Sequence, residues 1–275
     1  MIASASFPRL IHLKIKVCRG VYLALIFTSR SLPSLESITL QGDIYELPLT
    51  ANEKVALLHS LLKYHPTLSS LSLRGTTGDG HIWTPGCFDV PHATYSNLQT
   101  LTTESIIRPY LRMPGISTFL PISLAKQLTK LCTALDAKCF QLLSSMQTLQ
   151  ECIFVAGGDS VNNILHALPP SITRLLIMIR EFYDYGEGYH ARRYRWYRSR
   201  FNLVPINHLP NLTHFGGIIT RDRLYQIEEH PTLKYVSFPP HYNRWILFQE
   251  AIEHQRNRID IETQQTLSDV FPWYD

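Results

Sequence analysis

The chain has 275 residues, is 45% hydrophobic and 17% charged, and carries a formal net charge of +4. This composition supports a sizeable core and excludes a disordered chain, in which apolar residues are scarce. A surface this mildly basic tolerates acidic partners but does not by itself indicate a nucleic-acid-binding protein.

A short template, Pro-x-Leu-x-x-Leu-x-Leu, recurs along the sequence. Six copies keep the proline, and they begin at Pro8, Pro33, Pro66, Pro170, Pro210 and Pro231. Three weaker copies lack it, and they begin at Ser96, Lys126 and Gln147. The alternation after the leading leucine predicts a short strand in each copy, because the side chains of a strand point to its two faces in turn. The proline ends the preceding helix.

Several segments between the strands have the pattern of helices. Thr50 and Glu53 form a capping box that opens a helix over 51–65. Its apolar face holds Val55, Leu58, Leu61 and Leu62. Further helices are expected over 137–146, capped by Asp136, over 161–168, capped by Asp159 or Ser160, over 221–230, opened by Thr220, and over 243–258. The intervals 75–97 and 104–125 are rich in Pro and Gly, and we expect loops there.

The template resembles the leucine-rich repeat, L-x-x-L-x-L, and the resemblance covers about residues 7–241. It implies an α/β fold, an irregular leucine-rich repeat solenoid shaped as a horseshoe. About nine parallel strands are expected on the concave face, with helices and loops on the convex face. The Asn or Cys that the family carries three positions after the last leucine appears only as Cys18. The regular polar ladder of the family is therefore expected to be missing.

Irregular repeats without that ladder resemble the repeat region of F-box/leucine-rich-repeat proteins, a type abundant in fungi. No F-box is seen in the sequence. The expected organisation is a leucine-rich repeat solenoid over 1–241, with an insertion at 181–204, followed by a C-terminal helical cap and tail over 242–275.

On the concave face, the template places mainly polar side chains in the first four repeats and apolar ones in the later repeats. The apolar candidates for binding a partner are Ile153, Val155, Leu176, Met178 and Ile218. Two explanations stay open. Either residues 181–204 or the C-terminal tail covers this half, since monomers seldom leave a large apolar patch bare, or a partner protein docks on it.

The segment 180–202 interleaves arginines with aromatic residues. Its candidates for binding a partner are Arg192, Arg193, Arg195, Trp196, Arg198 and Arg200. Arginine with aromatic rings suits phosphate pairing and base stacking, and arginine equally suits the carboxylates of an acidic protein. The segment also fits an amphipathic helix lying on the solenoid, with Tyr194, Tyr197 and Phe201 at helical spacing.

The sequence offers no pattern typical of a catalytic, metal or cofactor site, and none of these is expected. Its twelve histidines are not clustered at metal-ligand spacing, and neither HExxH nor CxxC occurs. The odd number of cysteines, five, indicates a reducing compartment, so we expect a cytoplasmic or nuclear location. The apolar run over 21–27 is far shorter than a membrane span, and no membrane association is expected.

These observations indicate a non-catalytic protein–protein interaction module and not an enzyme. The resemblance implies the substrate-recognition region of an F-box-type ubiquitin ligase adaptor. Such a region is expected to engage a ligase scaffold only if an F-box exists outside this chain. The alternative is a scaffold or nucleic-acid-associated binder that uses the segment 180–202. Fold alone does not identify the partner.

Overall fold

The computed structural model of the protein describes residues 7–17, 32–42, 50–75, 83, 85–103, 115–135, 138–156, 158–179, 206–217, 229–237 and 260–262. The chain divides into two compact units, Met1–Ala134 (unit 1) and Leu135–Asp275 (unit 2). Within each unit the strands are parallel, and each pairs with its neighbour in chain order.

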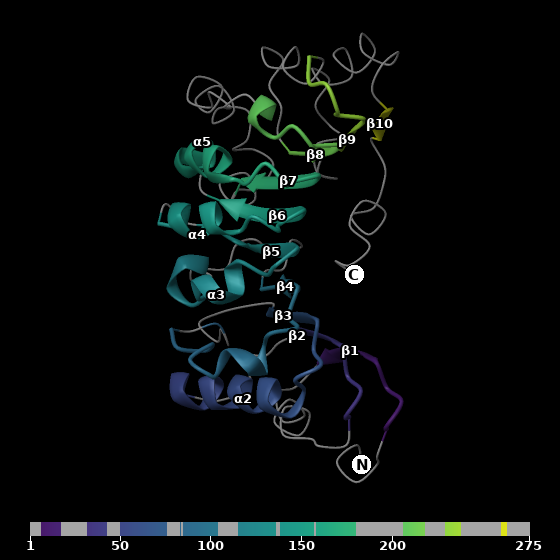
Figure 1. The fold of residues 1–275 in the computed structure, drawn as a ribbon, viewed down its shortest axis with the longest axis vertical. Helices are drawn as coiled ribbons and strands as arrows, with labels where there is room; N and C mark the ends of the chain where they lie inside the picture. Colours follow the sequence, from purple (N-terminus) through teal and green to yellow (C-terminus); the bar gives the residue numbers. More distant parts are fainter. Residues whose placement is uncertain are drawn as a thin grey trace, which may run out of the picture. The chain divides into compact units, whose positions relative to one another are not determined.

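Unit 1 carries its described helices on one side of its strands (Figure 1). The strands are β1 (His12–Val17), β2 (Ser37–Gly42), β3 (Ser70–Gly75), β4 (Thr100–Thr102) and β5 (Lys130–Ala134). The helices are α2 (Ala51–Tyr64) and the short α3 (Ile122–Ala125), together with two 3₁₀ turns, η3 (His92–Thr94) and η4 (Ile116–Thr118). Equivalent residues of neighbouring strands lie opposite one another, as Ile38, Leu71, Leu101 and Leu131 do.

Unit 2 repeats this arrangement. Its strands are β6 (Glu151–Ala156), β7 (Arg174–Ile179), β8 (His214–Gly216), β9 (Tyr235–Ser237) and β10 (Asp260–Glu262). Its described helices are α4 (Phe140–Ser145), α5 (Gly158–Ala167) and the 3₁₀ turn η6 (Ile206–His208). The strand β10 pairs with β9 but follows no template, and the sequence pattern does not predict it.

The nine templates coincide with β1 to β9, and each strand begins two residues after the leading apolar residue. The leading residues form the core. Leu35, Leu98, Leu128, Leu149, Ile172 and Leu212 are 0% exposed, and Leu68 and Leu233 are 2% and 7% exposed. The expected α/β arrangement, with parallel strands paired in chain order, is therefore confirmed within each unit.

A turn before each strand explains the proline of the template. The N–H of the leading residue donates to the carbonyl of the residue just before the proline, as from Leu35 to Leu32 (3.3 Å) and from Leu212 to Leu209 (3.0 Å). Proline suits the second position of such a turn because its ring fixes φ near the required value. The same bond joins Leu98 to Tyr95 (3.0 Å), where the copy has no proline.

A polar ladder does exist, at a position different from that of the family. In seven repeats the second residue of the template is Ser, Thr, Asn or Gln, and its side chain donates to a carbonyl of the preceding repeat. The donors and acceptors are Ser34 to Pro8 (2.8 Å), Thr67 to Leu35 (2.8 Å), Asn97 to Pro66 (2.9 Å), Gln127 to Tyr95 (2.6 Å), Ser171 to Leu149 (2.7 Å), Asn211 to Pro170 (3.0 Å) and Thr232 to Pro210 (2.9 Å). These bonds tie each repeat to the one before it.

The interval 75–97, expected to be a loop, contributes to the core of unit 1. Trp83 is 1% exposed and stacks against Phe119 (5.5 Å between ring centroids) and Phe88 (6.1 Å). Its Nε1 donates to the carbonyl of Leu73 at 3.3 Å. Large aromatic side chains bury much area, so this interval packs inward although its backbone is irregular.

The start of a helix agrees with the prediction from the sequence where a capping box marks it. The capping box of α2 is present, since the Thr50 N–H donates to Glu53 Oε2 (2.7 Å) and the Glu53 N–H donates to Thr50 Oγ1 (3.3 Å). Two expected starts are wrong: α4 begins at Phe140 with Cys139 as its N-cap, and α5 already begins at Gly158, before both expected caps. The helices expected over 221–230 and 243–258 and the insertion at 181–204 lie largely or wholly outside the described residues.

The described cysteines are core residues. Cys87, Cys132, Cys139 and Cys152 are buried free thiols. Burial raises the pKa of the Cys152 thiol far above its ordinary value, with a smaller contribution from the nearby Cys139. Such a thiol packs as a small apolar group and is a poor nucleophile.

Two histidines occupy a core position of the repeat. His65 and His230 precede a template proline, where other repeats place Leu32 and Leu209, and each is 1% exposed. His65 Nδ1 donates to the carbonyl of Leu32 at 3.2 Å, and its Nε2 is buried without a hydrogen-bond partner among the described residues. Burial lowers the pKa of both rings, and hydrogen bonds to the backbone oppose it only in part.

We predict that Thr67→Val costs about 1 kcal/mol of unfolding free energy, the net value of one hydrogen bond, because it removes the bond to Leu35 and keeps the shape of the side chain. Thr39→Val is the matched control, since no bond of its hydroxyl is found within the described ranges. The control should change stability by less than about 0.5 kcal/mol. Urea unfolding measures both, and equal effects would show that the ladder bond does not stabilise the stack.

We also predict that stability falls as the pH drops below about 6.5, the pKa of histidine in an unfolded chain. Below that pH His65 and His230 are protonated in the unfolded chain, whereas their buried rings in the folded protein bind a proton less readily. Above that pH both rings are neutral in the folded and in the unfolded chain. The double variant His65→Leu/His230→Leu places leucine at both positions, as other repeats do with Leu32 and Leu209. Its free energy of unfolding should depend less on pH. Urea unfolding across this pH range provides the measurement, and an unchanged slope in the double variant would contradict the assignment.

Candidate functional site

The first residue of each strand projects from the face of the strands opposite the helices, because the next residue along is buried against the helices. We call these positions the first row. In unit 1 the first row is His12, Ser37, Ser70, Thr100 and Lys130, and in unit 2 its described members are Glu151, Arg174, His214 and Tyr235. The described side chains of both rows are exposed or half-exposed, and all are polar.

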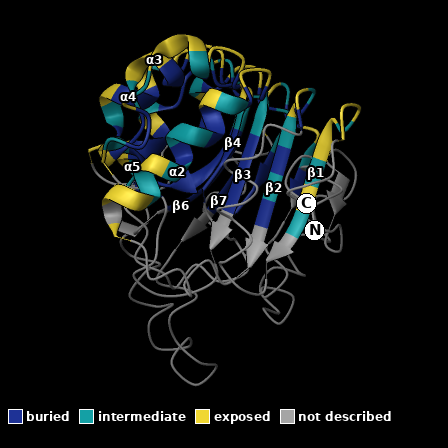
Figure 2. Ribbon diagram, turned by 90° about the horizontal axis from the view of Figure 1, so that it is seen from below, coloured by how far each residue is buried: buried dark blue, intermediate teal, exposed yellow. Residues whose placement is uncertain are grey.

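The positions two and four residues further along behave differently. Ile153 lies opposite Leu176, and Val155 lies opposite Met178, so the register brings these sequence candidates together. Ile153, Val155 and Leu176 are 0%, 1% and 2% exposed, and these strands are dark blue in Figure 2. These three side chains are thus buried, and binding of a partner there stays a prediction. The side chain of Met178 lies outside the described residues, as does Ile218.

The arginine and aromatic segment 180–202 also lies outside the described residues. This range includes Arg192, Arg193, Arg195, Trp196, Arg198 and Arg200. Its proposed binding role stays a prediction from the sequence.

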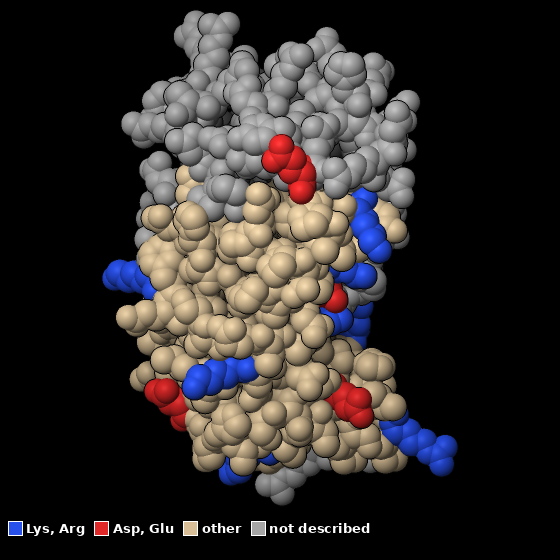
Figure 3. Space-filling model, turned by 45° about the horizontal axis from the view of Figure 1, so that its top comes forward, with Lys and Arg blue, Asp and Glu red and all other residues tan. Residues whose placement is uncertain are grey.

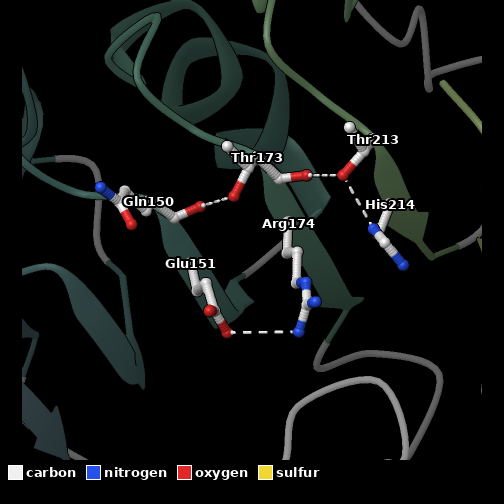
Figure 4. A network of polar contacts seen from close by, with 6 residues as sticks. All are labelled: Gln150, Glu151, Thr173, Arg174, Thr213 and His214. Atoms are coloured by element: carbon white, nitrogen blue, oxygen red, sulfur yellow. Dashed lines mark hydrogen bonds and ion pairs between the residues drawn. The ribbon is translucent and has the colours of Figure 1, made fainter. Parts of the chain in front are cut away.

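The first row of unit 2 holds a cluster of interacting polar side chains, which we call the Arg174 cluster: Glu151, Arg174, His214 and Tyr235. Arg174 Nη1 lies 3.9 Å from Glu151 Oε2, across β6 and β7 (Figure 4). The side chain of Arg174 is 33% exposed, whereas that of Glu151 is 13% exposed. The two groups are at the outer limit of an ion pair, and the side chain of Arg174 is partly exposed.

A chain of threonines orients His214 (Figure 4). Thr173 Oγ1 donates to the carbonyl of Gln150 (3.1 Å), and Thr213 Oγ1 donates to the carbonyl of Thr173 (3.0 Å). The Thr213 hydroxyl also shares a hydrogen bond with His214 Nδ1 at 2.8 Å. This bond holds the imidazole ring in place and leaves Nε2 on its other side.

Tyr235 completes the cluster on the next strand. Its ring stacks on His214 with centroids 4.4 Å apart and planes 22° from parallel. Partial burial lowers the pKa of His214, Arg174 lowers it further, and Glu151 raises it in part, while Lys234 adds a smaller lowering effect. Burial and the charge of Arg174 together therefore favour the neutral form of the His214 ring.

The Arg174 cluster combines a guanidinium fork, an imidazole ring and an aromatic face on adjacent strands. In Figure 3, blue and red atoms lie close to one another at the right of the view, and further charged side chains lie at its left. Among the described residues, no group of three His, Cys, Asp or Glu side chains could hold a metal ion. No described helix combines the length and apolar character needed to cross a bilayer.

The sequence pattern could have revealed the Arg174 cluster. Glu151, Arg174, His214 and Tyr235 each stand two residues after a leading apolar residue, where the first four repeats place His12, Ser37, Ser70 and Thr100. The change to apolar residues in the later repeats affects the inner positions of the strands, and the first row stays polar. What the template could not supply is the interaction of these side chains, which depends on register.

Comparison of the sequence with models of protein families gives no match, and comparison with curated proteins gives none either. The repeat fold and the geometry of the first row therefore carry the functional argument.

We predict that the charges of the cluster set the titration of His214. Arg174→Gln should raise the pKa of His214, because it removes a nearby positive charge, and Glu151→Gln should lower it. NMR titration of the imidazole measures both. A His214 pKa that moves in the same direction in both variants, or in neither, would contradict the arrangement.

Proposed function

We propose that this chain is a non-catalytic protein-interaction module that binds a segment of a partner protein across the first row of unit 2. The observation that carries this proposal is the Arg174 cluster, in which polar and aromatic side chains from successive parallel strands share one face. Stacked repeats commonly use such rows as extended binding surfaces.

The dimensions of the cluster suit an extended segment. Parallel strands lie about 4.8 Å apart, so the four strands β6 to β9 span about 14 Å. An extended chain covers that distance in about four residues. Arg174 would pair with a carboxylate of the segment, His214 Nε2 would form a hydrogen bond with a hydroxyl or amide, and Tyr235 would contact an apolar side chain. The favoured partner is thus a segment with an acidic and a hydrogen-bonding residue close together.

Within this class, the resemblance of the repeats to those of F-box/leucine-rich-repeat proteins favours a substrate-recognition role in a ubiquitin ligase. The support is the recurrent template and the parallel stacking of its strands. A ligase scaffold would be reached through an F-box supplied outside this chain.

A second candidate function rests on the segment 180–202. Its alternation of arginines and aromatic residues favours a scaffold or nucleic-acid-associated role, because such residues pair with phosphates and stack on bases. This role would make binding steeply dependent on salt, since counterions are released from the phosphates.

The experiment is affinity purification from the source cell, with quantitative mass spectrometry, of the intact chain and of the variant Arg174→Gln/His214→Ala/Tyr235→Ala. Gln141→Ala and Asn163→Ala, exposed positions of α4 and α5, are the matched controls. We expect a protein that the intact chain and both controls retain and that the triple variant reduces at least tenfold. Thermal unfolding verifies that all variants are folded.

The outcomes separate the candidates. Ligase subunits among the proteins retained by the intact chain and the controls support the adaptor role. Association that disappears after nuclease treatment supports the nucleic-acid alternative. A set of partners unchanged in the triple variant would show that the first row of unit 2 is not the binding surface.

A further inference from the structure

The strand β1 closes unit 1 and is less covered than its equivalents. Phe7 is 43% exposed, whereas the residues at the same template position in the next two repeats, Leu32 and His65, are 2% and 1% exposed. Ile11 is also 43% exposed. Leu13 and Ile15 are half-buried, while Ile38 and Leu40 opposite them are 0% exposed. Figure 2 shows this difference as yellow and teal on β1 and dark blue on the inner strands.

Strand β1 lies at one end of the strand order, and its outer main-chain groups have no partner among the described residues. In the following repeats, two successive N–H groups donate to one carbonyl of the repeat before, as Glu36 and Ser37 do to Ile11 (2.9 and 3.0 Å). The equivalent donors of β1 are the N–H groups of Ile11 and His12, for which the described part of the chain provides no acceptor. Because Ser37 bonds to Ile11, the alternate residues His12 and Lys14 turn their main-chain groups away from β2. Within the described ranges, the outer side of β1 is therefore a free edge.

Positive charge accompanies this edge. Arg9 is exposed and holds the template position from which Ser34 and Thr67 bond to the preceding repeat. His12 and Lys14 are exposed on the face opposite the helices. Glu36, also exposed, is the nearby acid on the adjoining repeat. The positive charges of Arg9 and Lys14 thus favour carboxylates on a strand that pairs with this edge.

The same charges disfavour a second copy of this chain. Two copies related by a two-fold axis would pair their β1 strands antiparallel and bring Lys14 and His12 of each near those of the other. Like charges across paired strands destabilise the pairing.

We propose that the free edge of β1 receives an extended segment of a partner protein, with carboxylate and apolar side chains in alternation, as an added strand. The N–H and carbonyl groups of His12 and Lys14 pair with its main chain. Its carboxylates lie beside Lys14 and Arg9, and its apolar side chains cover Leu13, Ile15 and Phe7. This surface lies in unit 1 and is independent of the proposed function, which rests on side chains of unit 2.

The test uses the full chain and two fluorescent, acetylated peptides of about eight residues, one alternating glutamate with valine and one alternating lysine with valine. Fluorescence anisotropy measures binding. We expect the glutamate peptide to bind and the lysine peptide to bind at least tenfold more weakly. Arg9→Glu with Lys14→Glu should reverse this preference, which tests charge recognition without requiring loss of binding.

The main-chain contact has its own matched pair of variants. His12→Pro removes an outward N–H and spares the bonds between β1 and β2, whereas His12→Thr keeps the N–H and suits a strand. We expect His12→Pro to bind the glutamate peptide at least tenfold more weakly than His12→Thr does. Urea unfolding verifies that both remain folded.

Three results would overturn the proposal. One is failure of the glutamate peptide to bind the intact chain, and another is equal binding by His12→Pro and His12→Thr. The third is a dimer of the intact chain, seen by sedimentation, that His12→Pro dissociates, because it would assign the edge to a second copy. None of these variants alters the Arg174 cluster, so any of these three results would leave the proposed function of unit 2 standing.

Discussion

The structure depends on one recurring turn. The carbonyl before the template proline accepts from the leading residue, with a donor–acceptor distance of 3.1 Å for Leu68 and 3.0 Å for Leu212. The side chain of the residue between the proline and the leading residue then donates to a carbonyl of the preceding repeat, as those of Thr67 and Asn211 do. Together these bonds fix where a strand begins and to which neighbour it is attached. Proline makes the turn favourable before the chain folds, since it restricts φ in the unfolded state as well. The polar side chain adds the link that a turn alone does not provide.

The binding surface follows from that constraint. Side chains alternate between the two faces of a strand, so a slip of one residue would exchange the core and the first row. The turn opposes such a slip, because the strand begins two residues after the leading residue that closes the turn. In unit 2 this alignment brings Arg174 beside Glu151 and stacks His214 on Tyr235, although the residues lie far apart along the chain. Repeat architecture thus turns a local rule of spacing into a surface made of several segments.

Local patterns predict the parts of this protein that depend on local bonds. The strand starts and the Thr50–Glu53 capping box could be predicted because neighbours in sequence determine them. The polar ladder could not be predicted from the resemblance, because the family carries its Asn or Cys after the last leucine. Here the hydrogen-bonding residues occupy the second position of the template. The stacking of Trp83 on Phe119 depends on a contact 36 residues away in sequence, which no periodicity encodes. The Arg174 cluster lies between these cases, because its positions follow the template and its interactions require the register.

The two proposed surfaces would recognise partners by different means. Inside the stack, neighbouring repeats use the main-chain groups of each strand, so only side chains remain to distinguish one partner from another. The Arg174 cluster would meet that condition with side chains held in place by their neighbours, as His214 is by Thr213 and Tyr235. At β1 the outer main-chain groups have no partner among the described residues, and any extended segment could in principle pair with them. Selectivity there would have to come from the charges of Arg9 and Lys14 and from the half-buried apolar residues between them. The first surface would therefore select by shape and hydrogen bonding, and the second would select by charge pattern along an extended chain.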